Sequence, residues 1–190
     1  MMFTNILKRY ESVDTTMGTD KNTSHSYGPV YDSIFLKYKD TTSNILEIGI
    51  SGGHALLAYA DYFEKASIYG LDIEDSCNYK TKIHQRIKLH FGDAKSEQVI
   101  KSYEGKQFDI IIEDASHLAD DQIRHFMDFN HFVAPGGIYI IEDIEQNHID
   151  YVSGVLKPYA EKQGFECNIL DLRTVKGRFD DILLVFKKKW

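Results

Sequence analysis

Three carboxylates follow two apolar runs of the sequence. Asp114 comes two residues after the run 107–112, and Glu142 and Asp143 come directly after the run 138–141. Ligands of open α/β sheets bind outside the carboxyl ends of the strands, so neighbouring strands would bring these acids together. Carboxylates that close repel one another and raise one another's pKa unless a cation lies among them. Because every donor is an oxygen, the sequence predicts Mg²⁺, Mn²⁺ or Ca²⁺ in preference to Zn²⁺.

A histidine stands next to this predicted metal site. His117 follows Asp114 by three residues, which places it on the turn or first helical turn after the strand. A neutral imidazole there would accept a proton from a hydroxyl that the cation polarises. The alternative is an ordinary surface histidine, since the chain contains eight. The position beside three acids favours the catalytic role, so we predict His117 and Asp114 as catalytic residues.

A glycine-rich turn follows the apolar run that begins at residue 44. The run predicts a strand buried on both faces, and the glycines let the backbone turn sharply and approach a ligand that any Cβ would block. Ser51 breaks the dinucleotide pattern G-x-G-x-x-G. The turn through Gly49, Ser51 and Gly53 therefore indicates a nucleotide ligand without specifying which one.

Three further acids suit different parts of a nucleotide. Glu47, two residues before the first glycine, is costly to bury unless a ligand amino group or the backbone amides of the turn pair it. Asp72 lies 25 residues after Glu47, the interval at which nucleotide-binding α/β units place an acid on a ribose diol. Asp93 is a candidate for contact with an adenine amino group. For Asp72 and Asp93 the alternative is a helix N-cap.

Alternating strands and helices must carry these residues to one edge. The predicted strands cover the run from residue 44 and residues 66–71, 86–91, 107–112, 138–141, 165–172 and 181–186. The predicted helices cover residues 2–10, 31–38, 55–63, 96–103, 122–132 and 150–163, with Pro158 as a candidate interruption of the last. Residues 173–178 are predicted to form a hairpin loop. This order predicts a parallel sheet completed by an antiparallel strand.

Composition narrows the class of protein. The chain has 190 residues, 43% of them hydrophobic and 27% charged, which is ordinary for one globular domain. The net charge of −7 argues against nucleic acid as the main partner. No apolar run is long enough for a membrane span or the core of a signal peptide. Cys77 and Cys167 have no metal-binding spacing and form no disulfide framework, so we expect a reducing, cytoplasmic setting.

Taken together, these motifs resemble those of a known family of enzymes. The motifs are Glu47 to Gly53, Asp72, Gly92-Asp93, Asp114-Ala115-Ser116-His117 and Glu142-Asp143. They are similar to those of the metal-dependent class I S-adenosylmethionine methyltransferases that methylate sugar hydroxyls, such as the macrolide-sugar and rhamnosyl O-methyltransferases. The segment Gly18-Thr19-Asp20-Lys21 with His25 and Tyr27 resembles the region before the core of that group.

The resemblance implies a fold and a set of site residues. The fold is a Rossmann-like α/β domain over residues 1–190, with amino-terminal helices and a ligand loop in 1–43 and the core in 44–190. Its seven-stranded sheet is mostly parallel, ends in an antiparallel strand and carries helices on both faces. Asp114, Glu142 and Asp143 would bind Mg²⁺, and His117 would be the general base. Glu47 and Gly49 would flank the methionine part of the cofactor, Asp72 would contact its ribose, and Asp93 and Ala94 its adenine. Ser51 and Gly53 are further predicted cofactor-binding residues. Tyr27 and the loop Thr19 to Lys21 would close over the cofactor or the acceptor.

The resemblance also implies a sugar or glycoside acceptor and leaves alternatives open. A catechol-type or other vicinal diol would use the same metal chemistry, and a binding module would keep the cofactor fold without catalysis. A dehydrogenase fits Ser51 and the acids poorly, and a nucleic-acid base methyltransferase would carry an Asn/Asp-Pro-Pro-aromatic motif where this chain has Asp114 to His117. Larger members of the group carry additional amino-terminal sequence, which leaves the oligomeric state open, a homo-oligomer included.

Overall fold

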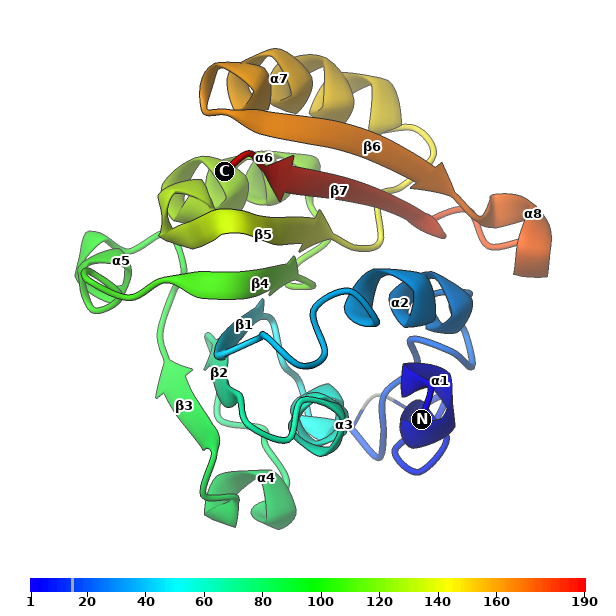
Figure 1. Ribbon diagram of the computed structural model, residues 1–190. Coiled ribbons are helices and arrows are strands. Elements are labelled where there is room, and N and C mark those ends of the chain that lie inside the picture. The colour runs from blue at the N-terminus through cyan, green and yellow to red at the C-terminus, as the bar shows by residue number, and fades with distance from the viewer. Residues whose placement is uncertain (15) are drawn as a thin grey trace.

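One seven-stranded sheet organises the protein. The structure is a computed structural model, and it describes residues 1–14 and 16–190. The strands lie in the order β3-β2-β1-β4-β5-β7-β6, with β1 to β5 parallel and β7 antiparallel to both β5 and β6 (Figure 1). Their bounds are β1 Asn44–Ile48, β2 Ser67–Asp72, β3 Ile87–Phe91, β4 Phe108–Glu113, β5 Val133–Ile141, β6 Phe165–Asp171 and β7 Ile182–Lys188. The predicted, mostly parallel sheet with an antiparallel last strand is confirmed.

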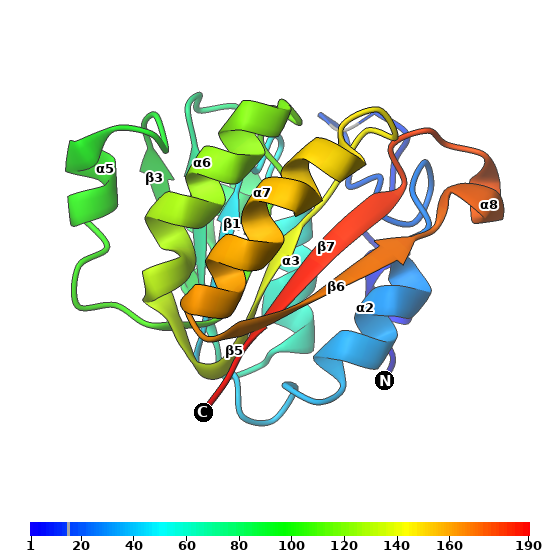
Figure 2. The ribbon, with the colours of Figure 1, turned by 90° about the horizontal axis from the view of Figure 1, so that it is seen from above.

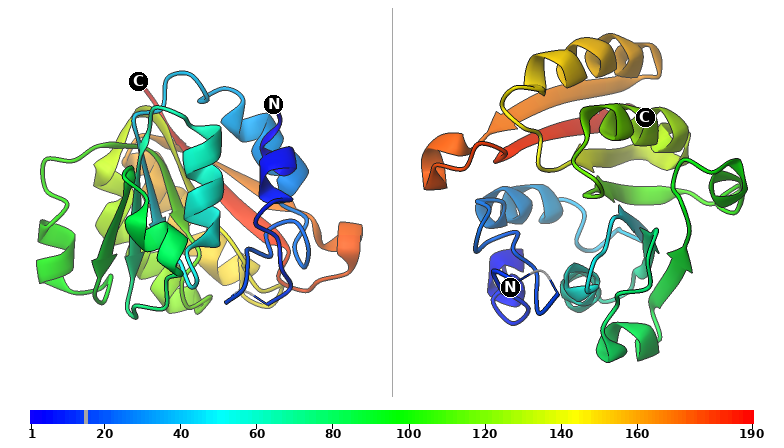
Figure 3. Two further views of the ribbon diagram at one scale, coloured as in Figure 1. Left: turned by 90° about the horizontal axis from the view of Figure 1, so that it is seen from below. Right: turned by 180° about the vertical axis from the view of Figure 1, so that it is seen from behind.

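Helices cover both faces of this sheet, as Figures 1 and 2 show. One face carries α1 Phe3–Leu7, α2 Gly28–Phe35 and α3 His54–Tyr62, with α4 Tyr79–Ile83 beside α3. The opposite face carries α5 Glu97–Lys101, α6 Ala119–Phe129 and α7 Ile149–Lys162. A 3₁₀ turn at Asn130–Phe132 and the short helix α8 Arg173–Lys176 complete the described elements. The two views of Figure 3 show α1 and α2 packed on the α3 side of the sheet.

The alternating directions of strand side chains explain why two separate cores form. Ile45, Ile110 and Ile138 point to the face covered by α1 to α3, whereas Leu46 and Ile111 point to the face covered by α5 to α7. All five are at most 2% exposed. Strands buried on both faces require near-continuous apolar runs, which is the pattern that predicted them.

Three local predictions differ from the structure. The helix α7 runs through Pro158 without interruption. The carbonyl that loses its amide donor belongs to the exposed Gly154, where water can replace the missing bond. The predicted hairpin is confirmed, because β6 and β7 pair antiparallel, but its loop contains the short helix α8, which ends at Gly177 with φ of 77°. The helix α4 was not predicted. The predicted helix 2–10 is shorter, Phe3–Leu7.

No helix in residues 1–14 and 16–190 has both the length and the apolar character that a bilayer crossing needs.

The turn after β1 is held close to the end of β4 by a glycine. Gly49 has φ of 83°, and a Cβ built there would lie 2.1 Å from the Asp114 carbonyl oxygen. Backbone that close cannot move aside without separating the two strands. Gly49 therefore allows β1 and β4 to bring their carboxyl ends together.

This constraint predicts the effect of a methyl group at Gly49. We expect Gly49→Ala to lower the free energy of unfolding by more than 3 kcal/mol, because left-handed strain of about 1–2 kcal/mol adds to the clash. Gly105→Ala is the matched control, since Gly105 has φ of 78° and no atom within 4 Å of its Cβ position. Urea denaturation of both variants measures the difference. Equal losses would show that the contact with Asp114 does not constrain the turn.

Candidate active site

Two cavities open at the carboxyl edge of the sheet and meet at the turn after β1. Cavity A has a volume of about 370 Å³ and cavity B about 230 Å³. Gly49, Ser51, Asp114 and Ala115 line both of them, so one ligand can extend from one cavity into the other. Open α/β sheets bind their ligands at this edge.

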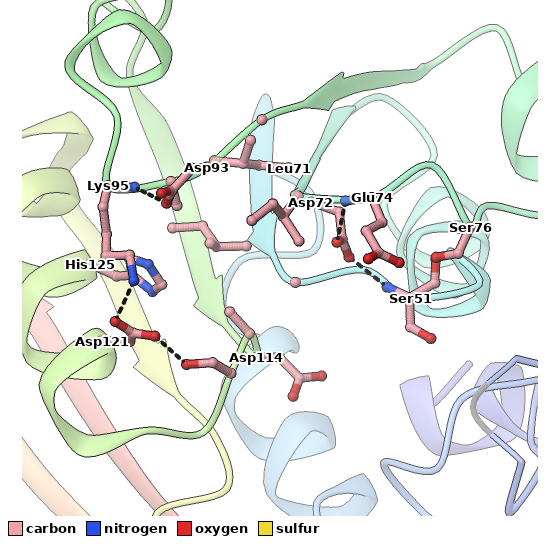
Figure 4. Close-up of a pocket in the computed structure, with 17 residues that line it drawn as sticks. Ser51, Leu71, Asp72, Glu74, Ser76, Asp93, Lys95, Asp114, Asp121 and His125 are labelled. Atoms are coloured by element: carbon pink, nitrogen blue, oxygen red, sulfur yellow. Dashed lines mark hydrogen bonds and ion pairs between the residues drawn. The ribbon is translucent and has the colours of Figure 1, made fainter.

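Asp72 lies in cavity A and also shapes its wall (Figure 4). Its Oδ2 accepts hydrogen bonds from the amides of Ile50 and Ser51 at 2.8 and 3.0 Å, and its Oδ1 accepts one from the Glu74 amide at 3.1 Å. A carboxylate offers about four acceptor positions, so one remains for a ligand hydroxyl. Asp72 is not a helix N-cap, because the next helix begins only after Asn78.

Asp93 lies across cavity A from Asp72 (Figure 4). Its Oδ1 accepts a hydrogen bond from the Lys95 amide at 2.8 Å, and Ser96 rather than Asp93 occupies the N-cap position of α5. Ala94 is 8% exposed and lines the same cavity. The structure therefore brings Asp72, Asp93 and Ala94 together, as a nucleotide ligand would require.

Two residues predicted to contact the cofactor line neither cavity. Gly53 precedes α3 with φ of 75°, and a Cβ there would come within 2.8 Å of Thr81 Cγ2, so glycine is needed for backbone shape and packing. Tyr27 is fully buried, and its hydroxyl donates a hydrogen bond to Asp143 Oδ1. Tyr27 thus positions one of the acids predicted to bind metal.

A buried ammonium group lies among four acids at the ends of β1, β4 and β5. These acids, which we call the acid cluster, are Glu47, Asp114, Glu142 and Asp143. Lys21 Nζ lies 2.6 Å from Asp114 Oδ2, 2.7 Å from Glu142 Oε2 and 3.3 Å from Glu47 Oε1. The Lys21 side chain is only 2% exposed, so solvent screens these ion pairs weakly. Lys21 therefore fastens the amino-terminal segment to the sheet.

Tyrosine hydroxyls bind further oxygens of the acid cluster. Tyr31 donates to Glu142 Oε1, so both oxygens of Glu142 are engaged. Tyr59 donates to Glu47 Oε1 at 3.0 Å. The other oxygen of Glu47, Oε2, is buried and has no hydrogen-bond partner in the described part of the chain, although Glu47 lines cavity B. Lys21 and Tyr59, rather than the backbone amides of the turn, bind Glu47, and they leave one of its oxygens for a ligand.

His117 and Asp143 also line cavity B. His117 Nε2 lies 3.1 Å from Asp114 Oδ1 and 3.5 Å from Asp143 Oδ2. One ligand atom from each of these three residues lies within 4.8 Å of the other two, so the three residues could hold a metal ion. Asp114 and Asp143 are thus placed as the metal prediction requires, whereas Glu142 is bound to Lys21 and Tyr31.

Backbone strain is concentrated at these loops. Among the residues that the structure describes, the non-glycine residues with positive φ are Ser51, His117 and Asp143, at 43°, 58° and 54°. They follow β1, β4 and β5, the three strands that carry the acid cluster. Strained backbone is commonly retained at functional sites.

The protonation of the site reflects burial and mutual repulsion. Burial raises the pKa of Asp143 to about 7, and the charge of Asp114 adds to this effect. Burial also raises the pKa of Glu47 to about 7, against the opposing charge of Lys21. Burial alone would lower the pKa of His117, but its hydrogen bond with Asp114 and the charge of that acid raise it to about 9. The site carries more negative charge than its own cations neutralise easily, and its oxygen donors fit a hard divalent cation.

The buried role of Lys21 was not predicted from the sequence. Its loop was expected to close over a ligand, and its lysine is 93 residues from Asp114 in the chain. Tyr31 and Tyr59 were assigned to helices with no polar role. The one available signal was that the sequence places several acids at the strand ends without a cation to pair them. Buried acids need such a partner, so a donor from elsewhere in the chain could have been expected.

The strand order, the two cavities and the acids define the class I methyltransferase fold. In agreement, a methyltransferase domain family matches residues 46–144 of the sequence. The chain belongs to this family.

Curated relatives support the predicted resemblance. Demethylmacrocin O-methyltransferase of Streptomyces fradiae is 34% identical over 129 residues, which are 63% of this chain and 32% of that protein. Mycinamicin VI 2''-O-methyltransferase of Micromonospora griseorubida is 30% identical over 168 residues, 83% of this chain and 40% of that protein. The chain thus spans well under half the length of these relatives.

Solved structures share the fold. MycE methyltransferase from the mycinamycin biosynthetic pathway, in complex with Mg and SAH, has a TM-score of 0.73 at 22% identity, covering 100% of this chain and 55% of that one. A putative caffeoyl-CoA O-methyltransferase from Staphylococcus aureus has a TM-score of 0.64 at 16% identity, with coverages of 95% and 87%.

Removal of the buried ammonium tests its importance for the fold. We expect Lys21→Met to lower the free energy of unfolding by about 3–5 kcal/mol, because the acids lose their shared cation in a desolvated place. Lys101→Met is the control, since that lysine pairs with Glu97 on the surface and such pairs contribute less than about 1 kcal/mol. Urea denaturation at pH 8 compares the two. A similar small loss in both would contradict the central role of Lys21.

The raised pKa values of the site predict how stability varies with pH. Between about pH 4.5 and 7 the unfolded chain releases the protons of Glu47 and Asp143 while the folded protein retains them, so stability falls as pH rises. His117 adds to the fall up to about pH 9, because its folded pKa lies above the unfolded value.

We therefore expect the melting temperature of the metal-free protein to fall from pH 5 to pH 9, and added Mg²⁺ to raise it more at pH 8 than at pH 5. Asp143→Asn should reduce both effects. Thermal denaturation with and without a chelator measures them. A melting temperature that rises from pH 5 to pH 9 would contradict the raised pKa values of Glu47, Asp143 and His117.

Proposed function

We propose that this chain is the catalytic region of an S-adenosylmethionine-dependent, Mg²⁺-dependent O-methyltransferase that acts on a hydroxyl of a sugar. The observation that carries the proposal is the junction of cavities A and B at Gly49 and Asp114. One cavity holds acids suited to a nucleoside, and the other holds a carboxylate and imidazole group suited to a metal and a proton transfer. Relatives named as O-methyltransferases of demethylmacrocin, of a rhamnosyl tetracenomycin-C and of mycinamicin VI support the acceptor class.

The cofactor assignment follows the chemistry of each cavity. Asp72 has one acceptor position left for a ribose hydroxyl, and Asp93 lies on the far side of cavity A, where an adenine amino group would be bound. Glu47 presents an unpaired, buried oxygen in cavity B, which suits the ammonium of the methionine part. The methyl-bearing sulfur would then lie between the two cavities, next to Asp114.

The acceptor is activated from the other side of cavity B. Asp114 and Asp143 would hold the metal, and Glu142 would join them only if Lys21 releases it. A divalent cation bound there would supply the charge that lowers the pKa of a coordinated sugar hydroxyl. His117 Nε2 is 40% exposed as a side chain and lies beside both acids, so the neutral imidazole would be placed to accept the hydroxyl proton. A cation held by Asp114 and Asp143 would oppose the negative charge that raises the pKa of His117, and so would favour this neutral form. Mg²⁺ prefers oxygen ligands, which leaves this nitrogen for the proton.

Binding and turnover measured together test the proposal. We expect calorimetric titration to show binding of S-adenosylmethionine and S-adenosylhomocysteine, and methyl transfer to rhamnosides or macrolide glycosides that a chelator abolishes and Mg²⁺ restores. Turnover that survives chelation would remove the metal from the mechanism. Turnover of catechols alone would replace the sugar by another vicinal diol, and binding without turnover of any acceptor would indicate a binding module.

The role of His117 has its own test. We expect His117→Asn to lower turnover by about 10²- to 10⁴-fold while the affinity for S-adenosylhomocysteine stays within twofold, because a general base contributes to the chemical step. Asparagine tolerates the positive φ of this position, so the loop keeps its shape. His148→Ala is the control, since His148 has a similar exposure of 41% and pairs with Glu145. Full activity of His117→Asn would exclude this histidine as the base.

A further inference from the structure

A buried histidine lies beside Asp143, and the proposed chemistry does not use it. His25 is 2% exposed, and its Nδ1 lies 3.2 Å from Asp143 Oδ1, the oxygen to which Tyr27 also donates. The other oxygen, Asp143 Oδ2, lies 3.5 Å from His117 Nε2. His25 lines neither cavity A nor cavity B, whereas Asp143 and His117 line cavity B. His25 and Tyr27 therefore engage one oxygen of Asp143 and leave the other for a ligand.

A second buried acid contacts His25 from the start of β7. Asp181 is 0% exposed, and its Oδ1 lies 3.3 Å from His25 Nδ1 and accepts a hydrogen bond from the Ser26 amide at 3.1 Å. Strands β5 and β7 pair antiparallel, so the start of β7 adjoins the end of β5, which Asp143 follows. His25 thus lies between two acids at the adjoining ends of these strands.

Other parts of the chain fix the loop that carries His25. Lys176, in α8, donates hydrogen bonds from Nζ to three carbonyls of this loop, those of Asn22, Thr23 and His25. The imidazole stacks on the ring of Tyr27, with 4.8 Å between the ring centroids and 25° between the planes. The place of the His25 ring is therefore set by α8, by the start of β7 and by Tyr27 together.

The polar atoms around His25 are not fully paired. His25 Nδ1, Ser26 Oγ and Asp181 Oδ2 are buried and have no hydrogen-bond partner in residues 1–14 and 16–190, although two carboxylates lie close to His25 Nδ1. Unpaired buried polar groups are costly and rare in folded proteins. Apolar side chains commonly stabilise a fold as well as or better than a buried charged group. Stability alone therefore does not explain this cluster, and a role in the site next to it does.

We propose that His25 is a positioning residue for Asp143. Held by Asp181, it keeps Asp143 Oδ1 beside the amino-terminal segment, so that Asp143 Oδ2 faces His117 and Asp114. This inference rests on the proposed metal site and adds to it residues that do not themselves bind the ion. Partners that orient a metal ligand are commonly worth about 10- to 100-fold in metal affinity.

Metal affinity measured apart from turnover tests the inference. We expect His25→Ala to weaken Mn²⁺ binding by about 10- to 100-fold in an electron paramagnetic resonance titration. The affinity for S-adenosylhomocysteine, measured without metal, should stay within twofold and shows that the variant is folded. His25→Asn, whose amide can donate from about the position of Nδ1, should recover part of the Mn²⁺ affinity. A loss of packing alone predicts no such recovery.

A second buried histidine provides the matched control. His125 is 4% exposed, and its Nδ1 lies 3.0 Å from Glu113 Oε1, so His125→Ala removes a similar contact with an acid outside the acid cluster. We expect this variant to have a lower melting temperature and a Mn²⁺ affinity within twofold of the wild type.

Asp181 gives an independent variant of nearly unchanged shape. Asp181→Asn keeps an acceptor for the Ser26 amide but removes the charge beside His25, and we expect it to weaken Mn²⁺ binding as well. Added to His25→Ala, it should weaken binding by less than a further twofold, because Asp181 acts through His25.

Unchanged Mn²⁺ affinity in His25→Ala, an equal loss in His125→Ala, or fully additive losses in the double variant would overturn the inference. Wild-type protein that binds no Mn²⁺ would instead overturn the metal in the proposed function, so the two failures are distinguishable.

Discussion

The contact of the Lys21 ammonium with Glu47, Asp114 and Glu142 is the interaction on which the site depends. A parallel sheet gathers the ends of its strands, and here β1, β4 and β5 each end in acids that would repel one another in a dry place. One buried cation reduces that repulsion and at the same time holds the amino-terminal segment against the sheet. The Lys21 side chain therefore has two roles: it holds the residues before β1 against the sheet, and it offsets the negative charge of the site.

This arrangement joins the two halves of the proposed reaction. Lys21 contacts Glu47, the acid assigned to the cofactor ammonium, and also Asp114, the acid assigned to the metal. Any cation that a ligand brings to either acid shares a carboxylate with Lys21. Occupation of one side changes the charge felt on the other, so cofactor and metal binding are expected to be coupled through Lys21 and Asp114. The tyrosines on Glu47, Glu142 and Asp143 limit how far the acids can move in response.

The sequence predicted the frame of the site better than its electrostatics. Strands β1 and β4 and the second half of β5 are buried, mostly apolar runs, and the topology of a parallel sheet then requires that the acids at their ends meet at one edge. The contacts of Lys21, Tyr31 and Tyr59 with the acids could not be predicted in this way, because these residues lie far from their partners in the sequence. A lysine in a polar loop is also expected to be exposed. The short helix α8 was predicted to be a loop, because four residues without a clear helical pattern cannot be distinguished from a turn in the sequence.

The left-handed residues show why the site resists prediction from local pattern. Ser51, His117 and Asp143 adopt positive φ although none is glycine, and such conformations cost about 1–3 kcal/mol each. Local sequence preferences therefore do not predict a positive φ at these three residues. Hydrogen bonds from the Ile50 and Ser51 amides to Asp72 and from Tyr27 to Asp143, and the contact of His117 Nε2 with Asp143 Oδ2 at 3.5 Å, link each loop to a different part of the chain. The conformations of the three loops are thus set by long-range polar contacts, and the three strained residues, Ser51, His117 and Asp143, all line cavity B.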